Sequence, residues 1–471
     1  MIEDLKPYPQ YKDSGLPWLG QVPEHWEIRP ASGAFSPIRE RNTGMKEKII
    51  LSLSYGRIVV KPAGKLHGLV PESFDTYQIV NPGVTVIRTT DLQNDKTSLR
   101  TGIVRDRGII TSAYLALSTS DGLLPEFGYQ ILNAWDITKA IYGYGSGLRQ
   151  NLDFSDFRRM PVAVPPIAEQ AFIARFLAWA TNCLDRAIGA KRRIIALLQE
   201  QKQAIIHRAV MQGLDPSVPL KDSGIPWLGE IPEHWEVKKI RSLAEVYGGM
   251  TPSKSAERYW TGDTPWISPK DMKQFEITGS IAHISDAAVR ETGIAAIPFP
   301  AVLFVVRGMI LARKLPVAVT RIPVTLNQDM KGLMPRVDIS AEYLAFLLSG
   351  AQKEILGLVE EAGHGTKCLR TDSWASFEVP LPARQEQNAI CNFILSANSA
   401  IDNAALRLDS EITLLREYRT RLIADVVTGK LDVRELAAGL PEPQNVKGAQ
   451  LEPEEEEPEF EDEDVEIESM D

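Results

Sequence analysis

The sequence lacks the features that mark membrane and secreted proteins. Its 471 residues contain no apolar run of about 18 residues, which excludes a recognisable transmembrane helix. The N-terminus, MIEDLKPYPQYKD, has no apolar core of the kind a signal peptide carries. The three cysteines, Cys183, Cys368 and Cys391, fit neither a metal-site spacing nor a paired disulfide set. These absences favour a protein of the reducing cytoplasm with no membrane partner.

Catalytic motifs are missing as well. There is no G-x-x-x-x-G-K-[ST] phosphate loop, and no motif of the Asn/Asp-Pro-Pro-aromatic type found in amino-methyltransferases. His25 and His234 do not stand at a metal-ligand spacing from acidic residues. The sequence therefore predicts a protein that is not an enzyme and that has no metal or cofactor of its own.

Positive charge is absent from the end of the chain. Residues 451–471 carry 13 acidic side chains and no lysine or arginine. Without them, the net charge of −10 becomes +3, because 52 basic residues then face 49 acidic ones. Such a segment buries too little apolar surface to fold, so we expect a disordered, solubilising acidic tail over 436–471. A tail that mimics DNA or docks a partner is the alternative.

A domain-sized internal repeat organises the rest of the chain. Residues 13–27, DSGLPWLGQVPEHWE, return 209 positions later as DSGIPWLGEIPEHWE, with 12 of the 15 positions identical. A second echo, VAVPPIAEQ at 162–170 and VPLPARQEQ at 379–387, has an offset of 217. Two copies of one unit indicate two sites with the same kind of task. Because His25 and His234 belong to the repeated box, we expect them to have a structural role in the part that both copies share: packing, capping or contact with a partner. Trp18, Trp26, Trp227 and Trp235 are expected to anchor a small core in each copy.

Two long segments are predicted to be helices. Residues 169–211 contain one glycine and no proline, and residues 384–428 contain neither. Apolar residues recur in both at intervals of three, four or seven, and each helix would be about 60 Å long. The seam positions are Ile173, Leu177, Leu184, Ile195 and Leu198 in the first helix, and Ile390, Ile394, Ile401, Leu408 and Leu415 in the second.

The connection between the copies decides how the helices pair. Residues 213–219 reach about 25 Å at most, too short to return along a helix of that length. We therefore expect an antiparallel two-helix rod with the two bodies in a pseudo-twofold arrangement. Separate packing of each helix on its own body is the alternative. Short β-like runs such as VTVIRTT and AVLFVVRG give each body an α+β character.

Polar and basic residues gather at turn-like positions of both bodies. Arginine, lysine, asparagine and glutamine are the side chains that read base edges and hold phosphates, although most charged loops are only solvated. Two glycine-basic turns, GYGSGLRQN at 143–151 and GHGTKCLR at 363–370, suit a phosphate clamp or a plain tight turn equally. The candidate DNA-binding residues are Arg57, Lys61, Arg88, Gln93, Asn94, Arg105, Arg149, Lys254, Lys270, Lys273, Arg307, Arg313, Lys314, Gln328, Lys367 and Arg370.

These motifs together resemble the specificity subunits of Type I restriction–modification systems. The resemblance is carried by the doubled DSG-[LI]-PWLG-x-[VI]-PEHWE box, the doubled P-x-x-x-EQ and VVTGKLDVRE at 426–435. Body two adds GGMTPSK at 248–254, PWISPKDM at 265–272 and NQDMKG at 327–332. The resemblance spans residues 8–435 and leaves out the acidic tail.

The resemblance implies a division into recognition and spacer parts. Target recognition domains would occupy 1–164 and 214–381, and conserved spacer helices 165–213 and 382–435. Each domain would read one half of a split double-stranded DNA target through the major groove. The helices would dock two modification subunits, which use S-adenosylmethionine, and two restriction subunits would add ATP- and Mg-dependent translocation. The nearly neutral body departs from the expected basicity and suggests that partners make many phosphate contacts.

Two other functions remain open on the residues alone. A two-headed scaffold would join proteins instead of DNA, and its assembled complex would lack salt-sensitive nucleic-acid binding. A self-contained restriction enzyme would need the catalytic motifs that the sequence lacks. The bases that are read do not follow from the sequence.

Overall fold

The computed structural model describes residues 5–15, 19–54, 56–61, 73–90, 99–143 and 152–441. The acidic tail beyond residue 441 and the candidates Gln93, Asn94 and Arg149 lie outside these residues. The described chain forms two compact units. The first combines the residues up to Lys191 with those from Asp409 onward, and the second comprises Arg192–Leu408.

Two long helices contribute to both units. Helix α4 spans Ile167–Gln212 and helix α10 spans Arg384–Val427, which confirms both predicted helices to within two residues at each end. α4 begins after Pro166, and α4 and α10 end before Gly213 and Gly429, whose φ angles of 78° and 77° suit glycine. Gly213 and Gly429 therefore follow the two helices in the left-handed conformation that favours glycine.

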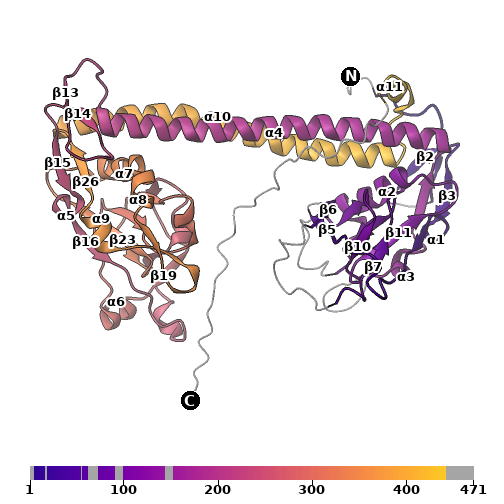
Figure 1. Ribbon diagram of the computed structural model, residues 1–471, viewed down its shortest axis with the longest axis horizontal. Coiled ribbons are helices and arrows are strands. Elements are labelled where there is room, and N and C mark those ends of the chain that lie inside the picture. Colours follow the sequence, from indigo (N-terminus) through magenta and orange to yellow (C-terminus); the bar gives the residue numbers. More distant parts are fainter. Residues whose placement is uncertain are drawn as a thin grey trace. The chain divides into compact units, whose positions relative to one another are not determined.

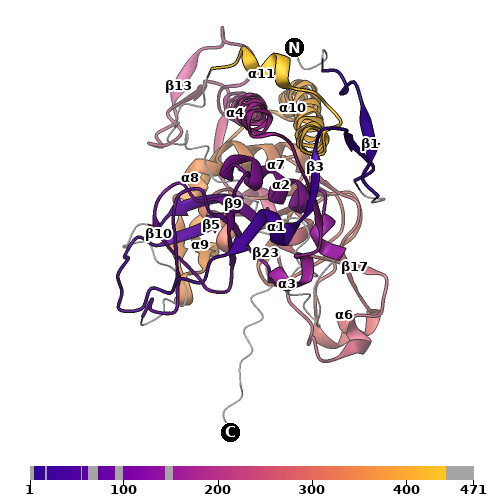
Figure 2. The ribbon, with the colours of Figure 1, turned by 90° about the vertical axis from the view of Figure 1, so that its right-hand side faces the viewer.

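The helices run antiparallel within each unit, as Figure 1 shows. In the first unit, Asp185 of α4 pairs with Arg419 of α10 at 2.6 Å, and Lys191 pairs with Glu411. In the second unit, Lys202 pairs with Asp402 at 2.6 Å. Residue numbers thus rise along one helix as they fall along the other, which confirms the predicted antiparallel pairing. Figure 2, seen nearly along the axes, shows α4 and α10 as neighbouring coils.

The predicted seam positions are buried in the N-terminal half of each helix and half-buried beyond it. Ile173, Leu177, Leu184, Ile390, Ile394 and Ile401 are buried, whereas Ile195, Leu198, Leu408 and Leu415 are half-buried. The buried ends pack on the globular parts of their units as well as on the partner helix. Phe176 and Ile206, which the heptad pattern does not include, are also buried there.

The first unit is built on a four-stranded sheet in the order β4-β11-β8-β9, with every neighbouring pair antiparallel. Hairpins β1–β2 and β5–β6 and the pairs β3–β12 and β7–β10 surround this sheet. Its strands are β1 (Tyr11–Asp13), β2 (Gln21–Pro23), β3 (Glu27–Pro30), β4 (Phe35–Pro37), β5 (Leu51–Ser54), β6 (Arg57–Val60), β7 (Gln78–Val80), β8 (Thr85–Ile87), β9 (Thr101–Ile103), β10 (Gly108–Ile110), β11 (Leu115–Thr119) and β12 (Pro161–Val164). Its short helices are α1 (Ala31–Ala34), α2 (Pro125–Ile137), η3 (Ala140–Gly143), α3 (Phe154–Phe157) and, after α10, α11 (Arg434–Ala438).

The second unit has a five-stranded sheet in the order β16-β23-β20-β21-β18 and a three-stranded sheet, β19-β17-β22. Its strands are β13 (Leu220–Asp222), β14 (Glu230–Pro232), β15 (Glu236–Lys239), β16 (Ala244–Gly248), β17 (Thr264–Ile267), β18 (Glu276–Ile277), β19 (Ala282–Ile284), β20 (Val302–Val305), β21 (Val317–Thr320), β22 (Thr325–Leu326), β23 (Met330–Pro335), β24 (Val359–Glu361), β25 (Lys367–Leu369) and β26 (Glu378–Leu381). Its short helices are α5 (Ile240–Leu243), η4 (Glu257–Tyr259), η5 (Pro269–Asp271), α6 (Asp286–Thr292), η6 (Met309–Ala312), α7 (Ala341–Gly350), α8 (Gln352–Leu356), η7 (Gly363–Gly365) and α9 (Thr371–Ala375).

The two units share one topology although their body sequences scarcely match. The order β4-β11-β8-β9 in the first unit corresponds to β16-β23-β20-β21 in the second, with the same antiparallel pairings. A helix follows the second strand of each order, α2 after β11 and α7 after β23. The three-stranded sheet of the second unit packs with α6 around Trp266 and Ile284. In the first unit, a parallel bridge between Ile50 and Ile109 links the β5–β6 hairpin to β10, much as β17 pairs in parallel with β22. The duplication therefore extends from the repeated boxes into the sheets.

None of the helices in the described part of the chain is both long and apolar enough to cross a membrane.

Candidate nucleic-acid interface

In each unit, the histidine of the PEHW box contacts the glutamate of the EQ pair at hydrogen-bond distance, and this pair of residues is called the latch below. His25 Nε2 lies 2.8 Å from Glu169 Oε2, and His234 Nε2 lies 2.8 Å from Glu386 Oε2. Each histidine comes from a PEHW box, and each glutamate comes from the EQ pair at the start of a long helix. These contacts confirm that the repeated histidines serve the frame.

The glutamine of each EQ pair joins the long helix to the helix that follows the sheet. In the first unit, the Gln170 side chain accepts the Leu124 N–H at 2.8 Å and donates to the Gly122 and Pro165 carbonyls. In the second, the Gln387 side chain accepts the Ser340 N–H at 3.0 Å and donates to the Asp338 and Pro382 carbonyls. Leu124 and Ser340 are the N-cap residues of α2 and α7. The glutamine of the EQ pair thus holds the start of the corresponding helix in each unit, α2 in the first and α7 in the second.

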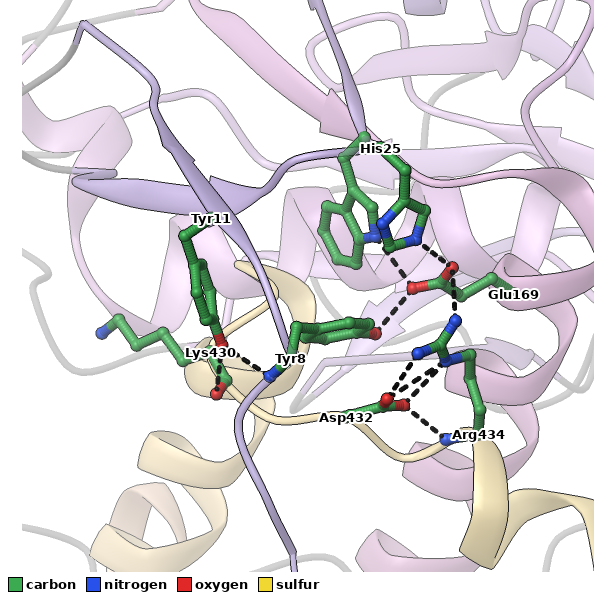
Figure 3. A network of polar contacts seen from close by, with 8 residues as sticks. Tyr8, Tyr11, His25, Glu169, Lys430, Asp432 and Arg434 are labelled. Atoms are coloured by element: carbon green, nitrogen blue, oxygen red, sulfur yellow. Dashed lines mark hydrogen bonds and ion pairs between the residues drawn. The ribbon is translucent and has the colours of Figure 1, made fainter.

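The latch of the first unit has additional partners, as Figure 3 shows. Glu169, which is 5% exposed, accepts hydrogen bonds from the Tyr8 hydroxyl at 2.6 Å and from Trp26 Nε1 at 2.8 Å. Burial and this carboxylate raise the pKa of Tyr8. Arg434 lies 4.0 Å from Glu169 and donates to Asp432 at 2.6 Å.

Among the described residues, no counterpart of these extra contacts occurs in the second unit. The indole Nε1 of Trp235, the counterpart of Trp26, is buried and has no hydrogen-bond partner within that part of the chain. Both indoles are fully buried, which confirms them as core anchors. Trp227 is half-buried and stacks on Phe377, whereas Trp18 lies outside the described residues.

In the second unit, three loops with distinctive motifs converge. The Met250 N–H from GGMTPSK donates to the Leu326 carbonyl at 2.8 Å, next to NQDMKG. The Asn327 N–H donates to the Ile267 carbonyl of PWISPKDM at 2.9 Å. Trp266 Nε1 returns a hydrogen bond to the Met250 carbonyl at 3.0 Å. Loops from three separate parts of the sequence therefore form one connected surface.

A fourth segment joins this surface. The Asp329 carbonyl accepts the N–H groups of Val306 and Arg307, and Arg307 forms a β-bridge with Cys368 of β25. The Arg307 side chain is 55% exposed, and its Nε lies 4.0 Å from Asp329 Oδ1. Burial raises the pKa of Asp329, and the nearby Arg307 partly offsets that effect. Of the predicted residues, Arg307, Gln328 and Lys367 thus lie on connected loops.

The other candidates of the second unit are mostly exposed. Lys367 pairs with Glu361 at 2.9 Å, and Arg370 lies 3.8 Å from Glu360, both within or next to the β24–β25 hairpin. The exposed side chains are Arg370, Lys254, Lys273, Arg313 and Lys314, whereas Lys367 and Lys270 are half-buried. Their contact with DNA stays a prediction.

The candidates of the first unit are tied to structural partners. Arg57 on β6 lies 3.6 Å from Asp185 of α4, and Arg105 lies 3.7 Å from Glu126 of α2. Lys61 is exposed and Arg88 is half-buried. The structure gathers no connected set of candidates here comparable with that of the second unit, within the residues it describes.

Sequence reasoning missed the residues that support the candidates. Thr251 donates to Gln328, and Asp329 orders the Arg307 loop, yet neither was selected as a candidate. Their positions inside GGMTPSK and NQDMKG were the available signal. Tyr8 lies outside the duplicated boxes and had no signal in the repeat, whereas Asp432 and Arg434 lie in VVTGKLDVRE, a motif that was not connected with the repeated histidine.

The described residues offer little chemistry for catalysis. No group of three or more His, Cys, Asp or Glu side chains placed to hold a metal ion occurs among them. A hollow of about 260 Å³ in the first unit lies between α2, β12 and α10 and is lined mainly by apolar residues. The titratable residue among its lining residues is Lys430.

Comparison with known proteins gives a consistent family. Residues 232–413 match the model of the Type I restriction modification DNA specificity domain. The specificity subunit of the EcoR124I/EcoR124II Type I restriction enzyme from Escherichia coli is 26% identical over 274 residues, 58% of this chain and 64% of that protein. The MjaIX specificity subunit from Methanocaldococcus jannaschii is 33% identical over 184 residues, 37% of this chain and 40% of that protein. The matches span less than two thirds of the length of these two relatives.

A solved structure has the same fold over most of the chain. A chain from a study of complex assembly and conformational transition of the Type I restriction–modification system covers 87% of this chain and 99% of its own length. Its TM-score is 0.61 at 15% sequence identity, which supports the fold alone. Residues 232–413 therefore match a Type I restriction modification DNA specificity domain, and the chain is similar to Type I specificity subunits.

Proposed function

We propose that this protein is the DNA-recognition subunit of a Type I restriction–modification enzyme, with each unit reading one half of a bipartite double-stranded target. The observation that carries the proposal is the shared sheet order and shared latch of two units with divergent surfaces. A common frame presents different loops, as two different half-sites require. The candidate residues would supply phosphate contacts and base readout in the major groove.

The subunit itself is proposed to be non-catalytic. Methyl transfer with S-adenosylmethionine and translocation with ATP and Mg would take place in partner subunits. Two modification and two restriction subunits would complete the enzyme, and its place would be the cytoplasm. Three free cysteines, Cys183, Cys368 and Cys391, are consistent with a reducing compartment.

The long helices are proposed to dock the modification subunits. α10 leaves Leu406, Leu414 and Tyr418 exposed at 65%, 63% and 40%, although apolar residues on a lone helix pair normally face inward. Leu414 and Tyr418 line a shallow groove in the first unit together with Lys191, Glu411 and Arg421. An apolar surface flanked by charges suits a protein partner.

The test is the assembled complex with its modification subunits. We expect it to bind DNA with an affinity that falls steeply with salt, and to methylate adenines in one split sequence. The isolated chain should show no methyltransferase, ATPase or nuclease activity. A complex that binds no DNA would favour the protein scaffold, and methylation by the purified chain alone would refute the non-catalytic role.

A further inference from the structure

A turn in the second unit presents a glutamine on a rigid base. β22 ends at Leu326 and β23 begins at Met330, so three residues make the connection. Asn327 is 7% exposed, and its Oδ1 accepts the Asp329 N–H at 3.0 Å. This Asx turn holds the peptide of Gln328 at the apex, where the side chain is exposed.

The turn is fixed by close backbone packing. A Cβ atom at Gly249 would lie 1.8 Å from the Asn327 carbonyl oxygen, so this approach requires glycine. Hydrogen bonds from Met250 to Leu326 and from Asn327 to Ile267 hold the turn from two neighbouring loops. The backbone that carries the Gln328 side chain therefore has a well-defined position.

The amide of Gln328 is also oriented. The Thr251 hydroxyl donates a hydrogen bond to Gln328 Oε1. This contact uses one of the two lone pairs of the amide oxygen and orients the two Nε2 hydrogens as donors. Reading adenine in the major groove takes both ends of a glutamine amide, one as acceptor and one as donor. An amide that is held by its oxygen is better matched to a ligand that only accepts.

The positively charged side chain of Arg307 lies next to the same turn. The Asp329 carbonyl accepts the Arg307 N–H at 3.2 Å, and the Asp329 carboxylate lies 4.0 Å from the Arg307 side chain. Asp329 is 25% exposed and Arg307 is 55% exposed, so much of the guanidinium remains accessible to solvent. Its remaining N–H groups add donors and a positive charge next to the Gln328 loop.

We propose that Gln328 and Arg307 form an anchor for one phosphate group of the DNA backbone, with Thr251 as the residue that positions Gln328. The proposal rests on the proposed DNA-recognition function and adds a role to these residues. Phosphate oxygens accept hydrogen bonds and carry negative charge, which matches the donor amide of Gln328 and a guanidinium that contacts the next residue, Asp329. The anchor fixes where the second unit sits on the duplex and carries no base information.

The experiment compares four variants in the complete complex with its modification subunits. Gln328→Ala removes the donor, Arg307→Ala removes the cation, and Thr251→Val removes the hydroxyl at nearly constant shape. Thr251→Ser is the matched control, because it keeps the hydroxyl. Dissociation constants are measured on the methylated target sequence and on single-base variants of it, over a series of salt concentrations.

The anchor predicts uniform losses. Gln328→Ala and Thr251→Val should weaken binding about three- to tenfold on target and variant DNA alike, and Thr251→Ser should stay near wild type. Arg307→Ala should weaken binding further and reduce the slope of log affinity against log salt by about one. The sequence that is methylated should remain unchanged in all four variants.

Three outcomes overturn the anchor while leaving DNA recognition intact. One is a relaxed base at a single position of the methylated sequence in Gln328→Ala, which would make Gln328 a base reader. Another is wild-type affinity for both Gln328→Ala and Arg307→Ala. The third is an equal loss of DNA affinity in Thr251→Ser and Thr251→Val, which would show that the Thr251 hydroxyl does not position Gln328. A wild-type complex that fails to bind DNA would instead refute the underlying function.

Discussion

At the residue scale, one latch occurs twice with different support. Glu169 holds His25, Tyr8 and Trp26, whereas among the described residues Glu386 holds His234 while the Trp235 indole is left without a partner. Glu386 is also more exposed, at 29% against 5%. The same sequence motif is therefore expected to contribute more to the stability of the first unit than to that of the second.

Replacing the two glutamates tests this inequality. Glu169→Ala should destabilise its surroundings by about 2–4 kcal/mol, because it leaves buried donors unpaired, and Glu386→Ala by about 1 kcal/mol. Hydrogen exchange of amides near the starts of α4 and α10 measures both effects. Tyr8→Phe is the milder control in the first unit. Equal losses at the two sites would contradict the assignment.

The Asp432–Arg434 pair predicts a pH dependence. Burial tends to raise the pKa of Asp432, but hydrogen bonds from Arg434 outweigh it and lower the pKa below the usual value. A lowered pKa means that this carboxylate stabilises the fold above its unfolded pKa, and that the contribution disappears as pH falls through the folded pKa.

Arg434→Met should remove that contribution. Burial would then dominate, the pKa of Asp432 would rise, and the ionised carboxylate would disfavour the fold at neutral pH. The difference in melting temperature between wild type and variant should be largest near neutral pH and shrink as pH falls from about 5 toward 3. A difference that stays constant over this range would show that Asp432 is not the responsible group.

The residue contacts mark the limit of sequence reasoning. The duplication of His25 and His234 indicated a frame role, and the contacts confirm it. The identity of the partner glutamate did not follow, because 144 residues separate His25 from Glu169 and the spacing depends on the whole body between them. The hydrogen bond from Thr251 to Gln328, which joins residues 77 positions apart, could not be predicted for the same reason.

At the element scale, local patterns predicted the helices and missed the sheet order. Composition and apolar periodicity located α4 and α10 to within two residues, because each helix has its own apolar period and few residues that break helices. The shared strand order could not be read from sequence, because it depends on long-range pairings between bodies whose sequences have diverged.

Charges introduced into α10 distinguish its seam from its outer surface. Ile401 is 8% exposed and Leu406, five positions later on the same helix, is 65% exposed. Ile401→Glu should cost about 3–5 kcal/mol and prevent folding or assembly. Leu406→Glu should leave the melting temperature unchanged and weaken binding of the modification subunit. If both variants melt like wild type, the seam is wrongly assigned; Leu184→Glu repeats the test in the first unit.

A buried asparagine in α10 gives a change of the opposite sign. Asn398 is 7% exposed, and its buried Oδ1 has no hydrogen-bond partner among the residues that the structure describes. Replacing it with leucine should remove the cost of that unpaired oxygen and stabilise the protein by about 1–2 kcal/mol. Thermal melting measures the effect. A loss of stability would instead indicate that the amide fixes the register of the helix pair.

At the scale of the whole molecule, charge and duplication fit a recognition subunit that works with partners. Residues 1–450 carry a net charge of only +3, so neutralisation of many phosphates would depend on the modification subunits. The acidic residues 451–471 add no basic group. Sequence predicted two units with one task, and the comparisons agree on the family, whereas the bases that each unit reads depend on side-chain placement that sequence does not determine.

The length of the helices should set the gap between the half-sites. Half-site centres about one DNA turn, roughly 10 bp, apart are expected for two units reading one face of the duplex. Seven residues inserted between Arg193 and Ile194 would add two helical turns, about 10 Å or roughly 3 bp. The spacer of the methylated sequence should lengthen while both half-sites stay the same. An altered base in either half-site would contradict a purely mechanical role for the helices.

The exchange of one body tests the central claim most directly. Residues 31–160, between the first PEHW box and β12, are replaced by the matching segment of a related subunit, and the methylated adenines of a host that carries the complete enzyme are mapped by sequencing. One half of the split target should change and the other should remain, because each unit reads its own half-site. A change in both halves, or in neither, would contradict the account.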